Sequence, residues 1–206
     1  MSIQDRAPAT ITTEFLPKKI ADTAPPRNTG TRRTVTVRAP VLAVLRIVMG
    51  LTFLWAFLDK MFGLGYSTSA AQAWINGGSP TKGFLANVHV GPLQSVLRAW
   101  AGTGWADWLF MLALLGIGAA LLLGVALRPT AVAAAVLLGL MWIAEWPLAR
   151  SGSDGTATSS SNPLIDYHLV YLLAIVVLAV FAAGDTWGLG RRWARLRFVQ
   201  RHRWLR

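Results

Sequence analysis

Four long apolar runs limit what this chain can fold into. They cover about 41–64, 105–127, 130–148 and 164–183, each roughly 19–24 residues long. At about 1.5 Å per residue, a helix of this length crosses the ~30 Å hydrocarbon core of a bilayer. A soluble bundle would need a polar face on each helix, and the segment LLGIGAALLLGVAL has none. The runs predict an all-α integral membrane protein, a bundle of four transmembrane helices.

The composition favours the same class. The chain is 54% hydrophobic and 14% charged and contains ten tryptophans, whereas a soluble domain carries about 25% charged residues. It has no cysteine, which excludes thiol–disulfide chemistry, thiolate-ligated iron–sulfur clusters and disulfides within the chain. The first forty residues lack the apolar core of a signal peptide, so we expect the first spanning helix to direct insertion.

Three regions are expected along the chain. Residues 1–40 are polar and rich in Thr and Pro, which predicts a disordered basic cytoplasmic tail. Residues 41–186 form the membrane domain, and 187–206 a basic amphipathic cytoplasmic tail. Within the long connection after the first run, PLQSVLRAW places apolar residues at i, i+3, i+4 and i+7. This spacing predicts an amphipathic helix that covers the outer surface.

The distribution of basic residues predicts the orientation. Seven Lys or Arg lie in 1–40, seven lie in 187–206, and Arg128 lies in the short link between the second and third runs, so fifteen basic residues share one side. The other connections hold three, namely Lys82, Arg98 and Arg150. Basic residues concentrate on the cytoplasmic side of membrane proteins. We therefore expect a multi-pass protein of the bacterial cytoplasmic (inner) membrane with both termini in the cytoplasm.

The basic C-terminal segment is expected to lie on the membrane surface. Trp193, Leu196 and Val199 recur at helical spacing with arginines between them, which is typical of an interfacial helix. Anionic headgroups attract such arginines. The partner predicted for this segment is the lipid bilayer, not nucleic acid, and the predicted lipid-binding residues are Arg191, Arg192, Arg195 and Arg197.

Small residues predict where the spanning helices approach closely. Gly116, Ala120 and Gly124 share one face of the second run. Faces of this kind allow helix backbones to pack against each other in lipid.

Polar side chains gather at the outer ends of the runs. Ionisable groups within spans usually face the bundle interior and mark function, so a shared outer pocket is expected. Its predicted catalytic residues are His168, Glu145 and Asp166, and its predicted substrate-binding residues are Lys60, Asp59, Tyr171 and Trp142. The alternative is a salt-bridge cluster that fixes helix register, surrounded by an ordinary aromatic belt.

Asp59 and Lys60, the charged pair of the first run, cannot both face the same partner, because adjacent helical residues point about 100° apart. We expect Lys60 to face the interior and to pair with Glu145 or Asp166, while Asp59 turns toward the outer loop or water. Arg46 lies near the inner end of the same run. Two partners are open for it: Asp185, or a lipid phosphate reached by snorkelling.

Such a pocket could bind a quinone-like or small anionic substrate, relay protons, or be purely structural. Only one histidine, His168, lies in a run, so haem is not expected, and neither is an iron–sulfur cluster or another metal. Five pieces of the chain, in order, are LRIVMGLTFLWAFLDKMFG, WINGGSPTKGFL, LLLGVALRPTA, NPLIDYHLVYLL and GDTWGLGRRW. In these pieces the sequence resembles the DoxX/DoxD-like family of small four-span bacterial membrane proteins.

This resemblance implies a quinone-linked redox role of the thiosulfate:quinone oxidoreductase type, with quinone as cofactor. It also implies a partner subunit or a soluble redox enzyme. Three functions stay open at this point: the membrane subunit of a quinone-linked oxidoreductase, a non-catalytic anchor or assembly factor for soluble redox partners, and a small-solute or ion carrier.

Overall fold

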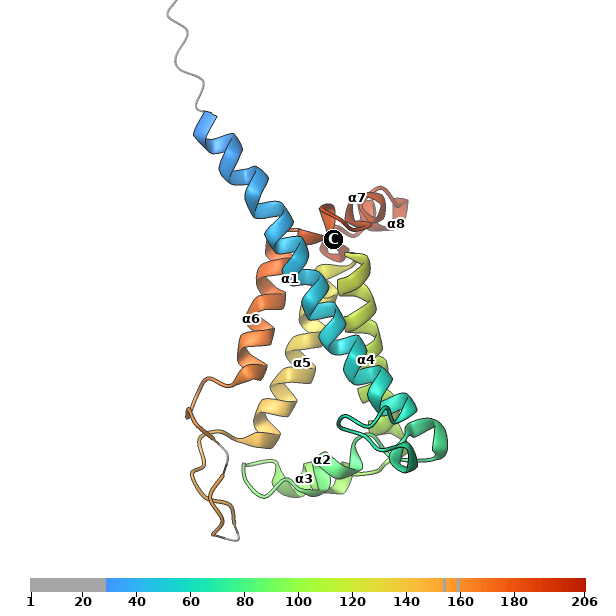
Figure 1. Cartoon of the computed structure of the whole chain (residues 1–206), viewed down its shortest axis with the longest axis vertical. Coiled ribbons are helices and arrows are strands. Elements are labelled where there is room, and N and C mark those ends of the chain that lie inside the picture. Colours follow the sequence, from blue (N-terminus) through green and yellow to red (C-terminus); the bar gives the residue numbers. More distant parts are fainter. Residues whose placement is uncertain (1–28, 154, 159) are drawn as a thin grey trace, which may run out of the picture.

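The described part of the protein is helical. A computed structural model describes residues 29–153, 155–158 and 160–206, and in these ranges it contains helices and no strand (Figure 1). The only extended pairing there is an isolated bridge between Ser151 and Ala157. The predicted all-α class is confirmed.

Three helices in the described ranges are long and apolar enough to cross a membrane. They are the Arg38–Phe62 part of α1 (Thr29–Phe62), α4 (Gly104–Leu123) and α5 (Leu127–Glu145). A fourth apolar helix, α6 (Tyr167–Val180), has 14 residues. At about 1.5 Å per residue it reaches roughly 21 Å, which is shorter than a full hydrocarbon core.

Different elements lie at the two ends of the bundle (Figure 1). The start of α1 and the C-terminus lie at one end, called here the terminal end, while α2 (Lys82–Ala86) and α3 (Gln94–Trp100) lie at the other, the loop end. Because α1 begins at Thr29, helix extends into the segment expected to be a disordered tail. The rest of that tail, 1–28, lies outside the described residues.

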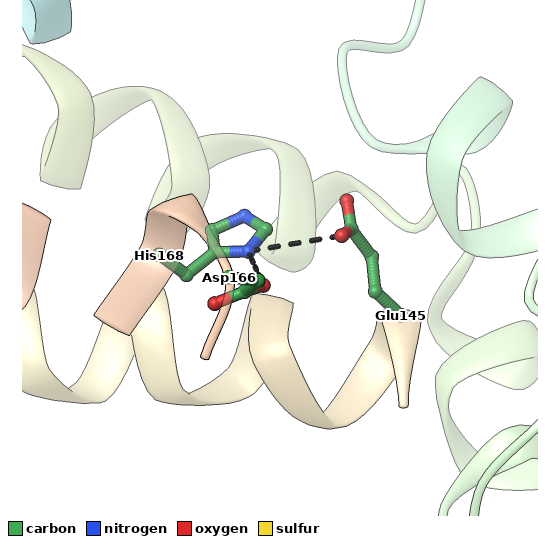
Figure 2. Close-up of side chains that lie close together, drawn as sticks. All are labelled: Glu145, Asp166 and His168. Carbon is green, nitrogen blue, oxygen red and sulfur yellow. Dashed lines mark hydrogen bonds and ion pairs between the residues drawn. The ribbon is translucent and has the colours of Figure 1, made fainter. Parts of the chain in front are cut away.

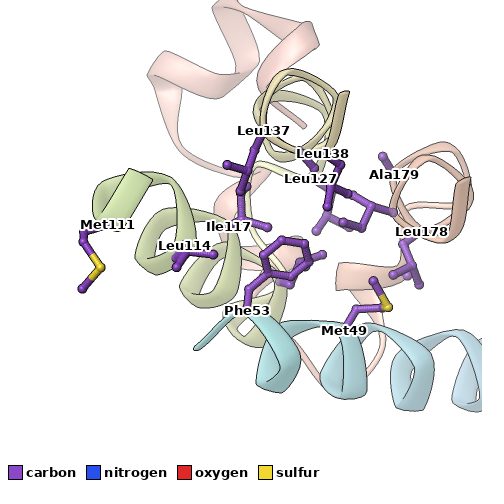
Figure 3. Packing of buried hydrophobic residues seen from close by; sticks show 14 residues of the cluster. Met49, Phe53, Met111, Leu114, Ile117, Leu127, Leu137, Leu138, Leu178 and Ala179 are labelled. Atoms are coloured by element: carbon purple, nitrogen blue, oxygen red, sulfur yellow. The ribbon is translucent and has the colours of Figure 1, made fainter. Parts of the chain in front are cut away.

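Apolar side chains from all four long helices meet in one core (Figure 3). Phe53 of α1, Ile117 of α4, Leu138 of α5 and Leu178 of α6 are each at most 4% exposed. Helix propensity alone would leave these helices marginal, so packing of this kind stabilises their arrangement.

Glycines set the distance between α1 and α4. A Cβ added at Gly118 would lie 2.8 Å from the Leu54 nitrogen, and one at Gly50 would lie 2.9 Å from the Leu122 nitrogen. Gly116, predicted to lie in a close helix contact, is exposed and has no atom within 4 Å of such a Cβ. The prediction of close packing on the Gly116 face is therefore wrong at that residue, because α4 turns Gly118 toward α1 instead.

Shorter elements cover the two ends. Leu97 of α3 is 2% exposed and packs with Val88 and Ala144, as expected for an amphipathic helix over the loop end. The remaining 3₁₀ turns there are η1 (Ala70–Gln72) and η2 (Trp74–Asn76). After η3 (Ala183–Asp185), the C-terminal segment forms three short pieces instead of one helix: α7 (Gly190–Trp193), α8 (Arg197–Arg201) and η4 (Arg203–Leu205).

Candidate functional site

Asp59 holds the first outer loop against the end of α1. It is 1% exposed. Its Oδ1 accepts a hydrogen bond from the Tyr66 nitrogen at 3.2 Å, and its Oδ2 accepts from the nitrogen and the hydroxyl of Ser67 at 2.9 and 2.6 Å. These donors satisfy the buried carboxylate. The expectation that Asp59 turns toward the outer loop is confirmed, and its role here is to fix that loop.

Asp107, in the first turn of α4, likewise holds a loop segment, the one that contains Ser79 and Thr81. It is 6% exposed. Its Oδ1 accepts from the Ser79 hydroxyl at 2.9 Å, from the Thr81 nitrogen at 3.0 Å and from the Thr81 hydroxyl at 2.6 Å. Asp59 of α1 and Asp107 of α4 therefore fix loop segments at the loop end through hydrogen bonds.

Lys60 does not make the expected pair. The ion pairs among the described residues join His168 to Glu145, His168 to Asp166, and Arg206 to Asp185. The prediction that Lys60 pairs with Glu145 or Asp166 is therefore wrong. The physical reason is the rotation of α1: Asp59 faces the loop donors, and Lys60, about 100° further round, stays half-buried away from the acids of α5 and α6.

Arg46 has neither of its expected partners. It is 0% exposed. Its Nη1 donates to the carbonyl oxygens of Leu121 and Leu122, and its Nη2 donates to those of Thr186 and Trp187. Asp185 instead pairs with Arg206 at 3.1 Å. Both sequence interpretations of Arg46 are wrong, because backbone carbonyls at the end of α4 are better placed than either a carboxylate or lipid.

The remaining polar residues meet between α5 and α6 (Figure 2). His168 Nδ1 lies 2.7 Å from Asp166 Oδ2 and 3.8 Å from Glu145 Oε2. The side chains of the three residues are 1%, 14% and 35% exposed, in the order His168, Asp166, Glu145. The sequence prediction that helix ends bring these three residues together agrees with this geometry. They are called the His168 cluster below.

Local sequence explains how the His168 cluster is positioned. Asp166 is the N-cap of α6, and its Oδ1 accepts a hydrogen bond from the Leu169 nitrogen at 3.1 Å. Aspartate is favoured at this position because it satisfies a free N–H of the first turn. Asn162 Oδ1 accepts hydrogen bonds from the nitrogens of Leu164 and Ile165 in the turn before the helix.

Tyr167 is a site residue that the sequence prediction missed. Its hydroxyl donates to Glu145 Oε1 at 2.8 Å, and its ring centroid lies 4.0 Å from that of His168. The signal available in the sequence was its place between Asp166 and His168 in the stretch DYH. Two of the predicted binding residues lie near the cluster. The ring centroid of Tyr171 lies 5.9 Å from that of Tyr167, and Trp142 Nε1 donates to the Leu164 carbonyl at 3.2 Å.

A cavity of about 600 Å³ lies against the cluster at the loop end. Glu145, Asp166 and Tyr167 line it, and segments 83–90 and 152–162 supply most of the other lining residues. His168 is not among the lining residues, and neither are Asp59 and Lys60. The predicted single pocket is therefore divided: Asp59 belongs to a loop anchor, and the acids of α5 and α6 face the cavity.

The cluster has two chemical possibilities. One donor atom each from Glu145, Asp166 and His168 lies within 4.8 Å of the others, a spacing that could hold a metal ion. The same spacing suits a proton held between an imidazole and carboxylates. One Asp166 oxygen already caps α6 and one Glu145 oxygen accepts from Tyr167, so both carboxylates have hydrogen-bond partners within the described structure.

The second ring nitrogen of His168 is unusual. Nε2 is buried and has no hydrogen-bond partner among the described residues. Figure 2 shows it on the side of the ring away from both carboxylates. A buried polar atom without a partner costs free energy of about 1–3 kcal/mol, so this atom is the clearest candidate for contact with a ligand.

These features define a class: an integral membrane helix bundle with a buried histidine–carboxylate cluster near one end of its spans. A protein-family model, DoxX, matches residues 41–146. The chain belongs to the DoxX family. The match includes α1 from residue 41 onward, all of α4 and α5, and Glu145, and it ends before Asp166 and His168. A search of curated proteins and a search of solved structures each found no match.

Proposed function

We propose that this DoxX-family protein is the membrane subunit of a quinone-linked oxidoreductase of the thiosulfate:quinone oxidoreductase type, in which His168 holds and passes a proton. The observation that carries the proposal is the buried imidazole whose Nδ1 contacts Asp166 at 2.7 Å while Nε2 has no partner among the described residues. Membrane histidines that pair with carboxylates are typical of proton relays.

In this proposal Asp166 determines which nitrogen of the His168 imidazole carries the proton. A carboxylate that contacts one ring nitrogen favours the proton on that nitrogen and leaves the other as an acceptor. With N–H at Nδ1 directed to Asp166, Nε2 of neutral His168 accepts a hydrogen bond. When His168 takes up a second proton, Nε2 becomes a donor and the ring forms ion pairs with Asp166 and Glu145.

These residues fit a quinone. Bound quinone supplies the exchange of two electrons together with two protons. Nε2 offers an acceptor to a hydroxyl in one protonation state and a donor to a carbonyl in the other, which matches the two redox forms of such a group. The Tyr167 ring lies beside the imidazole and the Tyr171 ring contacts that of Tyr167, and aromatic rings of this kind pair with other π-systems in offset-stacked or edge-to-face arrangements.

The cluster also provides a route for the proton. When Nε2 takes up a proton, Nδ1 can release its own proton to Asp166 at 2.7 Å or to Glu145 at 3.8 Å. Both acids line the loop-end cavity, whereas His168 does not. The chain's own residues therefore connect a buried position to a polar cavity, and the proposed partner, a soluble redox enzyme or second subunit, would handle the other substrate.

The proposal is tested by ligand binding. Purified protein in detergent is titrated with a short-chain ubiquinone analogue, and quenching of tryptophan fluorescence reports binding. We expect His168→Ala to weaken binding about tenfold, the loss of one hydrogen bond of ~1.4 kcal/mol. The matched control is His202→Ala, because His202 is exposed and lies in the C-terminal segment at the terminal end.

Equal binding by wild type and His168→Ala contradicts the proposal, and so does wild-type protein that binds no analogue. If the purified protein retains a soluble partner but binds no quinone analogue, the anchor or assembly function replaces this one.

A further inference from the structure

The C-terminal segment carries charge that the described structure does not neutralise. From residue 167 to the end, the sequence has seven arginines and one acid, Asp185. Arg206 uses that acid in an ion pair of 3.1 Å. The other six, all exposed and in no ion pair of the described residues, are Arg191, Arg192, Arg195, Arg197, Arg201 and Arg203.

This segment is folded onto the terminal end of the bundle. The Leu189 nitrogen donates to the Leu123 carbonyl of α4 at 2.8 Å. Trp193 Nε1 donates to the Leu205 carbonyl at 2.8 Å, which closes the segment on itself. Arg128, at the start of α5, donates to the Arg203 carbonyl at 3.2 Å. The segment is therefore attached where α4 ends and α5 begins, at one end of two helices that are long and apolar enough to span a bilayer.

The short helices direct their arginines away from the bundle. In α8, Val199 is 2% exposed, and Arg197 and Arg201 lie two residues before and after it. At about 100° per residue both project roughly 160° from Val199. In α7, the buried residue is Gly190, and Arg192 lies about 200° round from it. The fold thus buries the small and apolar positions and presents cations outward.

Large aromatic side chains are exposed on the same segment. Trp187, Phe198 and Trp204 are 65%, 62% and 58% exposed. Aromatic and arginine side chains together are characteristic of the boundary between headgroups and acyl chains. Exposing these large rings to water would not stabilise the segment, so their exposure favours contact with an apolar environment.

We propose that the C-terminal segment, residues 187–206, is a preformed docking surface for the headgroups of anionic phospholipids. The arginines bind the phosphate groups and Trp187, Phe198 and Trp204 enter the boundary region beside them. The occupant is chosen by charge complementarity and by the attachment of the segment at the ends of α4 and α5. This proposal is independent of the quinone-linked function.

The test uses the full chain in detergent, titrated with short-chain phosphatidylglycerol and, separately, with short-chain phosphatidylcholine. The rise in unfolding temperature gives an apparent Kd. Arg197→Gln/Arg201→Gln should raise the Kd for phosphatidylglycerol about thirty-fold, from the loss of two arginines near an anionic surface. The matched control, Lys82→Gln/Arg150→Gln, removes the same charge from exposed positions outside the C-terminal segment and should change it less than about twofold.

Arg197→Lys/Arg201→Lys keeps the charge and should retain most of the affinity, which shows that the glutamine variant has lost binding and not folding. The proposal is overturned if wild type prefers neither lipid, or if both double glutamine variants weaken binding equally. It is also overturned if inorganic phosphate alone gives the same shift, which would indicate a free-anion site, or if a short DNA oligonucleotide displaces the lipid.

Discussion

At the residue scale, Arg46 is a buried cation whose hydrogen-bond acceptors are all backbone carbonyls. They come from Leu121 and Leu122 at the end of α4 and from Thr186 and Trp187 after α6. The last carbonyls of a helix have no partner within it and carry partial negative charge. One guanidinium therefore satisfies the end of α4 and joins it to α1 and to the segment that follows α6.

Replacing Arg46 with methionine should cost about 3–5 kcal/mol of stability, since it leaves several buried carbonyls without a donor. The measurement is the unfolding temperature in detergent. Arg38→Met on the same helix is the control, because Arg38 is exposed. Equal unfolding temperatures for the two variants would show that water or lipid replaces the guanidinium.

Asp59 and Lys60 are neighbours with unequal roles. Asp59→Ala removes the acceptor of three hydrogen bonds that hold the Tyr66–Ser67 loop, and a loss of about 2–4 kcal/mol follows from unsatisfied donors near a buried site. Lys60→Met should change stability by less than about 1 kcal/mol, because Lys60 forms no ion pair with the described residues. Chemical denaturation in a fixed detergent compares them, and a larger loss for Lys60→Met would refute this assignment.

At the element scale, glycine contacts fix how the helix ends meet. A Cβ at Gly184 would lie 2.0 Å from the Gly124 carbonyl oxygen, which no side-chain movement relieves. Gly124 itself has a φ of +70°, a conformation that favours glycine after a helix. The end of α4 and the turn after α6 can therefore approach only while both positions lack a side chain.

Gly184→Ala should force these backbones apart and lower stability by more than about 3 kcal/mol. Gly116→Ala is the matched control: it lies on α4 in open space, so it should be neutral or stabilise by up to about 1 kcal/mol through helix propensity. Thermal unfolding of the two variants gives the comparison. A Gly184→Ala protein as stable as Gly116→Ala would mean that the close approach does not exist.

The same elements show what a sequence of this kind reveals. The apolar runs locate the three helices long enough to span, because length and hydropathy suffice for these, whereas the fourth run forms only the 14-residue α6. Glu145, Asp166 and His168 could be grouped because they share a depth at helix ends. The sequence does not show which face each helix turns toward its neighbours. The sequence prediction therefore assigned Lys60 the wrong partner and Gly116 the wrong contact. Backbone acceptors do not appear in a sequence pattern, so the environment of Arg46 was hidden.

At the scale of the whole molecule, the two ends of the bundle differ in charge and in structure. The start of α1 and the C-terminus share the terminal end, and α2, α3 and the cavity share the loop end (Figure 1). Of the basic residues outside the spans, fifteen belong to the terminal segments and the α4–α5 link, and three, Lys82, Arg98 and Arg150, belong to the loop-end connections. This asymmetry predicts that the terminal end faces the cytoplasm.

The orientation can be tested with reporters placed at both ends of the bundle. Green fluorescent protein fused after Arg206 should fluoresce, because it folds in the cytoplasm, and alkaline phosphatase inserted after Gly155 should be active, because it needs the oxidising outer side for its disulfides. Exchanging the two reporters is the control and should abolish both signals. The proposed proton route through Asp166 and Glu145 would then open to the outer side, since both acids line the loop-end cavity. Phosphatase activity from the Arg206 fusion would reverse the orientation and, with it, the side on which that proton is exchanged.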